Sequence, residues 1–398
     1  MTSFISIDEP QPPKATPPAF ALWALGFRPF YLLASAFAAF SIVLWAAQFS
    51  GWLTHPYLSG PLWHAHEMLF GFTLAVVVGF LFTAGRNWTG QPTPTGAWLA
   101  ALAALWLAGR VLVLTPFGWP AAIVDSAFPL ACAVALGIPF WAARAKRNYF
   151  FVGLLVLMGA ANFSIHLSQL GVTTLPGWLG LQIGLDAVLF IMAVMAGRVV
   201  PMFTNNGVPG ANAVRHALVE KAALGAVLLV LISDLAQLHG PAYALLLLAG
   251  AVAHGVRWLL WKPWRTLRTP LVWVLHAAYA WIAVHLGLRA AFELGWIGSS
   301  VANHALTVGA IGGLTIGMMT RTARGHTGRP LRADRFDTAS FALILLAAIV
   351  RVALPPLLPE WTMVAIITAA LLWSAGFGIY AVRFWPLLSR ARPDGKPG

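Results

Sequence analysis

The sequence predicts an all-α fold: a polytopic membrane helix bundle of about twelve transmembrane helices, with both termini in the cytoplasm. Hydrophobic residues make up 59% of the 398 residues and charged residues only 9%, whereas a soluble domain carries about 25% charged residues. The apolar residues form long runs, and the basic residues fall between alternate runs. These observations indicate one transmembrane domain over residues 19–386 rather than several soluble domains.

Each apolar run is long enough to cross the hydrocarbon core as a helix, which requires about 20 residues. Turn-forming sequences separate the runs, as in GQPTPTG at 90–96, NNGVPG at 205–210 and LPPLLP at 354–359. The predicted spans, in chain order, are 27–48, 62–84, 97–115, 121–143, 149–171, 178–203, 217–237, 241–262, 270–295, 299–322, 338–356 and 360–385.

Small residues and prolines distinguish three of these spans. The tenth carries Gly309, Gly313 and Gly317, and small residues at this spacing let a neighbouring helix approach closely. The fourth and sixth contain Pro129 and Pro201. Helices broken at these prolines would fit a secondary transporter, for which twelve spans with both ends inside is a common layout.

The positions of the basic residues predict the orientation of the bundle. The loops near residues 49–61, 116–120, 172–177, 238–240, 296–298 and 357–359 hold no Lys or Arg, and the opposite loops and flanks hold almost all of them. Because cytoplasmic loops carry the basic excess, both termini are expected inside, as a disordered Pro-rich segment at 1–18 and a tail at 387–398. The net charge of +13 therefore indicates a lipid bilayer and no nucleic acid as partner.

The cysteine count and the missing nucleotide motifs exclude several classes of protein. Cys132 is the single cysteine, which rules out intrachain disulfides, CxxC zinc sites, cysteine-ligated iron–sulfur clusters and CxxCH haem attachment. Any haem is therefore expected to be non-covalent, of b type. The chain has no P-loop and no Rossmann fingerprint, so nucleotide-driven transport is disfavoured.

Five histidines lie in predicted spans, and all map to the outer half of the bilayer. Placing an imidazole in the lipid interior costs free energy unless the ring is paired, hydrated or bound to metal. It is also a ligand for haem iron and for copper. The sequence therefore predicts a metal-cofactor site in which the candidate ligands are His64, His66, His166, His285 and His304.

Two considerations weaken a single-cluster interpretation of these histidines. A lone intramembrane histidine is more often a helix–helix hydrogen-bonding group than a ligand. His64 and His66 are spaced i, i+2, so in a helix they point to faces about 200° apart and need not bind one metal. On the cytoplasmic side, His254 and His276 are candidates for a second haem, although structural roles are favoured.

Polar neighbours of the histidines are expected to support the site. A carboxylate can hold a ligand imidazole by its second nitrogen. The predicted supporting residues are Glu67, Asn162, Asp186 and Glu293. The predicted partners of haem propionates are Arg110, Arg289 and Arg351. Since Arg289 and Glu293 are spaced i, i+4, they are also expected to form an ion pair.

The stretches that carry this chemistry resemble a known family. HAHEMLFGFTLAVVVGFLFTAGRNWTGQPTPTG at 64–96, AGRVVPMFTNNG at 196–207 and NHALTVGAIGGLTIGMMTRTARGHTGR at 303–329 are similar to the signature stretches of the NnrS family. The similarity runs from LGFRPFYLL at 25–33 to the last span. One departure is Arg86, where the pattern leads us to expect proline.

The resemblance implies a polytopic protein of the inner membrane of denitrifying and related bacteria, carrying haem and copper. It also implies a link to nitric oxide metabolism and to tolerance of nitrosative stress. Residue by residue, it points to His64, His66 and Glu67 of HAHE and to His304 of NHALT.

The leading hypothesis is a haem- and copper-binding protein that binds nitric oxide and turns it over as an oxidoreductase, with an unidentified electron donor. In this hypothesis His64 or His66 ligates one metal with His304, and His166 and His285 complete the other. The alternatives are a twelve-helix secondary transporter, and a sensor or metal-delivery protein without turnover.

Overall fold

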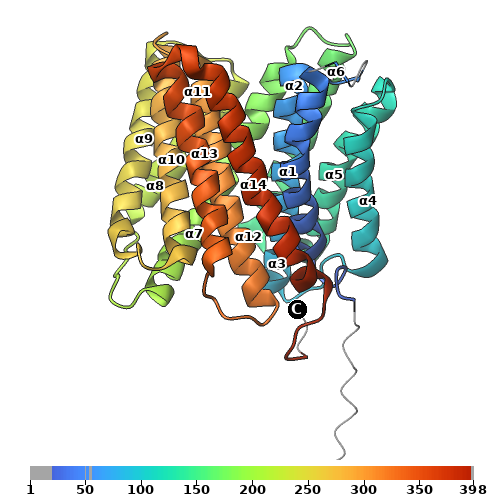
Figure 1. Ribbon diagram of the computed structural model, residues 1–398, viewed down its shortest axis with the longest axis vertical. Helices are drawn as coiled ribbons and strands as arrows, with labels where there is room; N and C mark the ends of the chain where they lie inside the picture. Colours follow the sequence, from blue (N-terminus) through green and yellow to red (C-terminus); the bar gives the residue numbers. More distant parts are fainter. Residues whose placement is uncertain (1–19, 50, 53–55, 396–398) are drawn as a thin grey trace, which may run out of the picture.

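The computed structural model describes residues 20–49, 51–52 and 56–395, and within them every regular element is helical. The long helices stand side by side and run between the two ends of the molecule (Figure 1). The predicted all-α class is therefore confirmed. The segment 1–18, predicted to be disordered, lies outside the described residues.

Most of the described chain lies in fourteen α-helices joined by short segments. The α-helices are α1 (Phe27–Phe49), α2 (Gly60–His66), α3 (Leu74–Thr89), α4 (Gly96–Leu112), α5 (Gly118–Ala142), α6 (Tyr149–Gln169), α7 (Gly177–Gly207), α8 (Ala217–Leu235), α9 (Pro241–Leu260), α10 (Pro270–Glu293), α11 (Ser299–His304), α12 (Gly313–His326), α13 (Arg335–Leu357) and α14 (Thr362–Ser389). Three short 3₁₀ turns are η2 (Lys146–Asn148), η3 (Pro263–Arg265) and η5 (Pro359–Trp361).

Ten helical segments within the described residues are long and apolar enough to cross a membrane. Two of the twelve predicted spans do not reach this standard. The helix Gly96–Leu112 is shorter than the ten, and α8 includes three charged residues, Glu220, Lys221 and Asp234. The membrane character of the bundle is thus supported, and the count of twelve stays a prediction.

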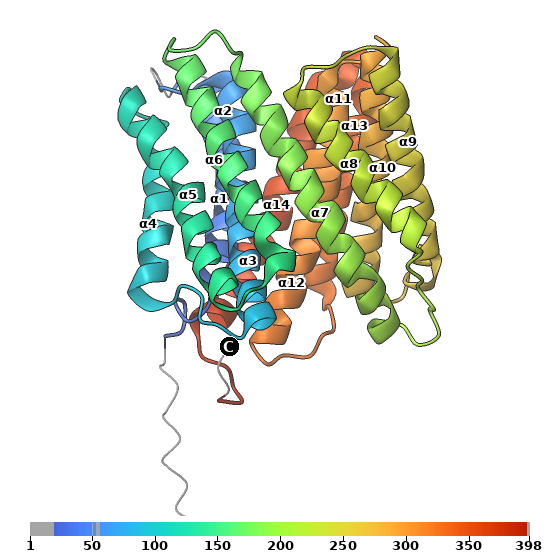
Figure 2. The ribbon, with the colours of Figure 1, turned by 180° about the vertical axis from the view of Figure 1, so that it is seen from behind.

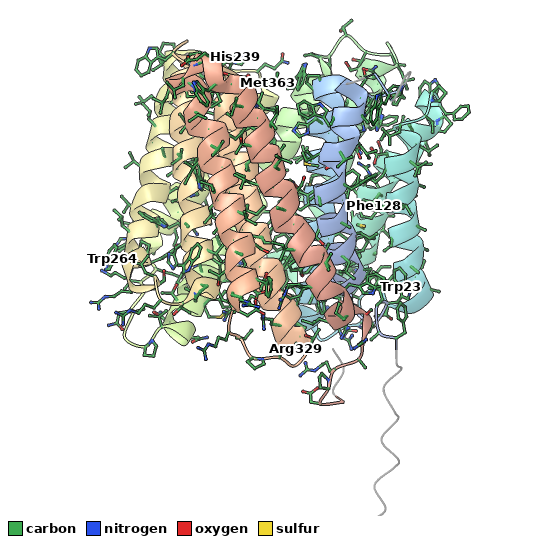
Figure 3. The ribbon with its side chains drawn as sticks, in the orientation of Figure 1. Trp23, Phe128, His239, Trp264, Arg329 and Met363 are labelled. Atoms are coloured by element: carbon green, nitrogen blue, oxygen red, sulfur yellow. The ribbon has the colours of Figure 1, made fainter. Side chains whose placement is uncertain are left out.

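Both described ends of the chain lie at one end of the bundle. The Ala21 amide donates to the Ser389 carbonyl at 2.7 Å, and Arg329 lies at the same end (Figure 3). We call this the basic end. The opposite end, where α2 and α11 begin and where His239 lies, we call the histidine end (Figures 1 and 3). Because both described ends of the chain lie at the basic end, the chain must cross between the two ends of the bundle an even number of times.

The bundle has two groups of helices that meet along α7 and along α1. Figure 2 shows α7 running obliquely between the α4–α6 group and the α8–α10 group, and α7 packs against both α6 and α8. On the other side, α14 packs along α1 (Figure 1). Helices α5 and α7 continue through Pro129 and Pro201, so the broken helices that would fit a transporter are not observed there.

Two spans contain π-helical segments, and each segment begins directly after a histidine. The segment η1 (Glu67–Thr73) follows His66 and leads into α3, and η4 (Ala305–Gly312) follows His304 and leads into α12. π-Helical turns are rare in proteins, and those that occur are often found at functional sites. The positions of η1 and η4 therefore indicate a functional site at the histidine end.

The glycine stripe of the tenth span packs closely against α10, as its spacing predicts. A Cβ atom added at Gly309, Gly313 or Gly317 would press on side chains of Trp281, Ala278 and Val274, respectively. These three partners lie on α10. The absence of side chains on one face of η4 and α12 thus lets the span carrying His304 approach the helix that carries His285.

Candidate metal centre

One group of three side chains that could hold a metal ion converges within the described residues: His66, Asp125 and His166. They come from α2, α5 and α6, which meet near the histidine end. Their candidate ligand atoms all lie within 4.8 Å of one another, and all three residues are buried. We call this group the His66 centre.

The geometry of the centre aims two imidazole nitrogens at one carboxylate oxygen. His66 Nε2 lies 3.1 Å from Asp125 Oδ2, and His166 Nε2 lies 3.1 Å from the same oxygen. Asn162 contributes its Oδ1 at 2.7 Å from His66 Nε2 and donates from Nδ2 to Asp125 Oδ2 at 3.0 Å. Two imidazoles and a carboxylate are a donor set suited to iron or copper.

The second nitrogen of each imidazole is held by a group outside the centre. His66 Nδ1 lies 2.9 Å from Glu67 Oε1, and His166 Nδ1 lies 3.3 Å from the Tyr57 hydroxyl. Burial and the Asp125 carboxylate raise the pKa of Tyr57 to about 12, so its phenol stays protonated at neutral pH. Metal-ligating histidines usually have such a partner, which orients the ring.

Arg110 of α4 neutralises part of the acidic charge around the centre. Its guanidinium forms ion pairs with both Glu67 and Asp125, and all three side chains are buried. The Arg110 guanidinium is therefore already paired with two carboxylates, whereas a partner of a haem propionate is expected to have a guanidinium without such partners. Glu67 Oε2 has no hydrogen-bond donor among the described residues.

Asp125 of the centre and Tyr57 beside it were not among the site residues predicted from the sequence. The signal for Asp125 was its position as a lone carboxylate inside an apolar span, where ionisable residues usually have a function. Tyr57 lies in the loop before α2, and no local pattern connects it with His166. Only the packing of that loop on α6 does so.

His64 points away from the His66 centre, as the i, i+2 spacing predicts. Its ring packs against Trp45 with centroids 5.1 Å apart, and its buried Nδ1 has no hydrogen-bond partner in the part of the chain that the structure describes. His64 is close enough to His304 and to Arg351 for electrostatic interaction. His304 Nδ1 lies 2.7 Å from the Ser300 carbonyl.

His285 lies beside the start of the tenth span and is separate from the His66 centre. Its Nδ1 is 2.8 Å from the Ala302 carbonyl, and its buried Nε2 has no partner among the described residues. The structure therefore groups the histidines differently from the expected division: His166 lies with His66, and His285 lies next to α11. The reason is that α6 packs mainly on α5 and α7, whereas α10 packs on α9 and on the tenth span.

The expected ion pair between Arg289 and Glu293 is wrong. Arg289 pairs with Asp234 of α8 through two contacts of 2.9 Å and lies 3.4 Å from Asp186. Glu293, one turn closer to the histidine end, accepts from the Gly240 amide at 3.1 Å and contacts His239. Buried carboxylates on neighbouring helices outcompete the same-helix partner. Asp186 is thus not placed against a histidine ring by any of these contacts.

The two histidines predicted on the cytoplasmic side make ordinary helix–helix contacts. His254 Nδ1 lies 2.6 Å from the Tyr279 hydroxyl, and its Nε2 lies 3.2 Å from the Ala223 carbonyl. His276 Nε2 lies 2.8 Å from the Thr204 hydroxyl. These contacts fit the structural roles favoured for both residues.

The family model described as NnrS protein matches residues 21–392. The chain belongs to the NnrS family. The match covers nearly the whole chain, including the HAHE and NHALT motifs and every residue of the His66 centre. A search among curated proteins found no match. NnrS membership fits a function related to nitric oxide and to metal binding.

Proposed function

We propose that this NnrS protein holds copper at the His66 centre and non-covalent haem at a second site at the same end, and that it binds nitric oxide and turns it over. The observation that carries the proposal is the convergence of His66, Asp125 and His166. The Nδ1 atom of each imidazole also contacts an orienting group, Glu67 for His66 and Tyr57 for His166. Imidazole nitrogen and carboxylate oxygen are donors that suit copper.

The second site would use the histidines that the centre leaves out. His64 Nδ1 and His285 Nε2 are buried nitrogens without hydrogen-bond partners among the described residues, and leaving a buried polar atom unsatisfied costs free energy. A haem iron would accept a lone pair from such a nitrogen, and His304 lies within interaction range of His64. Arg351, whose one hydrogen bond within the described residues goes to the Ser300 hydroxyl at 3.1 Å, would be available to a propionate.

Bound haem would supply an iron site for nitric oxide, and bound copper a second redox-active metal. The chain's own residues position these groups and keep them in an apolar surrounding. Nitric oxide is small and apolar, so it can reach the histidine end through the bilayer. In the inner membrane of a bacterium, removal of nitric oxide would relieve nitrosative stress during denitrification.

Metal analysis and optical spectra of the purified protein test the proposal. We expect His66→Ala and His166→Ala to lose copper and keep the Soret band, and His64→Ala and His304→Ala to lose the Soret band and keep copper. His239→Ala is the matched control, since its side chain is 70% exposed at the same end. Absence of both metals from the wild-type protein would contradict the proposal and favour a secondary transporter.

Turnover is tested separately from binding. With a chemical reductant, the wild-type protein is expected to consume nitric oxide, and the variants that lose either metal are not. Nitric oxide binding without consumption would instead support a sensor or metal-delivery protein.

A further inference from the structure

We propose that Asp186, Asp234 and Arg289 form a proton-binding site that exchanges its proton with water at the histidine end through an adjacent cavity. The site lies between α7, α8 and α10. It shares no residue with the His66 centre, and the inference does not depend on the function proposed above.

The three side chains form a compact buried group. Arg289 Nη1 and Nη2 lie 2.9 Å from Asp234 Oδ2 and Oδ1, and Nη1 lies 3.4 Å from Asp186 Oδ1. Tyr243 donates to Asp234 Oδ1 at 2.8 Å, and Gln182 donates to Asp186 Oδ1 at 3.0 Å. Asp186 is fully buried, and Asp234 and Arg289 are each 6% exposed.

The charges of the group balance only if it holds a proton. It contains two carboxyl groups and one guanidinium, and no other cation contacts Asp186 among the described residues. His285 lies one turn before Arg289 on α10, and His239 and Glu293 line the neighbouring cavity. An uncompensated charge is expensive in a buried site. One protonated carboxyl makes the group neutral.

The unpartnered oxygen of Asp186 gives further support for the proton. Asp186 Oδ2 is buried and has no hydrogen-bond donor among the described residues. Asp186 Oδ1 and Asp234 Oδ2 both face Arg289 Nη1, at 3.4 Å and 2.9 Å. Two ionised carboxylates only accept hydrogen bonds, whereas a protonated one donates. A proton on Asp186 Oδ2 turns the unpartnered acceptor into a donor and removes the repulsion between two ionised carboxylates.

A cavity connects the group with the histidine end. It has a volume of about 260 Å³, and its lining includes Asp234 and Arg289 of the group together with Gln182, His239 and Ser299. His239 lies at the histidine end of the bundle (Figure 3). A single water needs only about 10–15 Å³ of such volume, so the cavity can hold a chain of waters. Protonation transfers a proton from hydronium to a carboxylate, which leaves a carboxylic acid and water, without oxidation or reduction.

Infrared spectroscopy of the full-length protein tests the proposal. At neutral pH we expect the carbonyl stretch of a protonated carboxyl group, shifted by exchange into D₂O. Asp186→Asn should remove this band and still fold, because the amide replaces a neutral acid beside the intact pair of Arg289 and Asp234. Asp186→Glu should keep a band at a shifted frequency. Asp337→Asn is the control, since Asp337 is a buried acid of α13 paired with Arg324, and it should leave the band unchanged.

The access route is tested by the rate of exchange. Ser299→Trp fills the cavity and should slow the D₂O shift several-fold, whereas Val364→Trp, at an exposed position of α14, should not. Absence of the band from the wild-type protein, or its persistence in both Asp186→Asn and Asp234→Asn, would overturn the proton site. An unchanged exchange rate in Ser299→Trp would overturn the route through the cavity.

Discussion

At the scale of single residues, the His66 centre depends on Asp125. This one carboxylate faces two imidazoles and a guanidinium, so it is both a candidate ligand and the counter-ion that keeps Arg110 buried. Such a network stabilises the protein only when it is complete, because a buried charge that loses its partner keeps its full desolvation cost. The residues around the centre should therefore tolerate substitution poorly.

Arg110→Gln should destabilise the protein by about 3–5 kcal/mol, because it leaves Glu67 and Asp125 without their buried counter-charge. Equilibrium unfolding in detergent measures the change. Arg351→Gln is the control, since the Ser300 hydroxyl is the one group to which Arg351 donates across residues 20–49, 51–52 and 56–395, and its loss should cost about 1 kcal/mol or less. Equal effects of the two substitutions would contradict the assignment of Arg110 to a buried ion-pair network.

Tyr57→Phe should lower the metal affinity of the His66 centre about 10–100-fold, the usual effect of removing a partner that orients a ligating histidine. The phenol contacts His166 Nδ1 and donates to the His166 carbonyl at 3.1 Å. Titration of the metal-free protein with copper measures the affinity. Tyr243→Phe, which removes a hydroxyl from the separate Asp234 site, should bind copper normally. A normal affinity in Tyr57→Phe would show that the loop does not orient His166.

At the scale of elements, the π-helical segments set the direction of the histidines. In η1 the chain accommodates more residues per turn than an α-helix, so α2 is rotated relative to α3. His66 thereby faces α5 and α6 while α3 keeps its own packing against α1. The segment η4 holds the same position after His304.

Deletion of Met68 should convert η1 into an α-helix and rotate α2 by about 100° relative to α3. His66 would then leave Asp125 and Asn162, and the protein should lose copper while it keeps its helix content. Metal analysis and circular dichroism measure the two outcomes. Met68→Ala, which keeps the residue count, should bind copper as the wild type does. Normal copper content in the deletion variant would mean that η1 does not position His66.

The start of α13 provides a prediction of pH dependence. Asp334 accepts hydrogen bonds from the Phe336 and Asp337 amides and pairs with Arg324 and Arg383. Partial burial opposes ionisation, but these amides and guanidiniums outweigh it and lower the pKa of Asp334. Because the pKa in the folded state lies below its unfolded value, the stabilisation is present at neutral pH and is lost as the pH falls through the folded-state pKa.

Asp334→Ala should therefore reduce the free energy of unfolding by about 1 kcal/mol at neutral pH, the usual cost of losing an N-cap. The difference from the wild type should shrink in acid, since the wild-type carboxyl is then protonated. Unfolding measured over a range of pH tests this. Asp334→Asn, which can still cap the helix, should cost less at neutral pH. A difference that grows as the pH falls would contradict the lowered pKa of Asp334.

At the scale of the whole molecule, the contact between Ala21 and Ser389 ties the two described ends of the chain together at the basic end. Every helix that bears a candidate ligand reaches the opposite end of the bundle (Figure 1). The proposed metal sites and the two described ends of the chain thus lie toward opposite ends of the bundle. If the basic end is cytoplasmic, the proposed sites face the outer half of the membrane.

A topology reporter fused after Gly398 should be active only in the cytoplasm, and one fused before the first residue should report the same side. A second reporter inserted in the loop after Gln237 should be active only outside, because that loop lies at the histidine end (Figure 3). Outside activity of the C-terminal fusion would reverse the orientation and place the histidines near the cytoplasm.

The sequence by itself determined the helical class, the membrane character and the NnrS membership, and it identified the histidines of HAHE and NHALT. These features are encoded locally, in apolar runs, glycine spacing and contiguous motifs, so they do not require knowledge of which helices are neighbours. The spacing of His64 and His66 also predicted correctly that the two rings point to different groups.

Only the tertiary structure decided which side chains meet. It placed His166 with His66, brought in Asp125 and Tyr57, and paired Arg289 with Asp234 instead of Glu293. The physical reason is that a buried polar group takes whatever partner the neighbouring helices offer, and partners such as Asp125 and His166 are separated by 41 residues of chain. Periodicity predicts which residues share one face of a helix. Helix packing decides which residues of the neighbouring helices that face contacts.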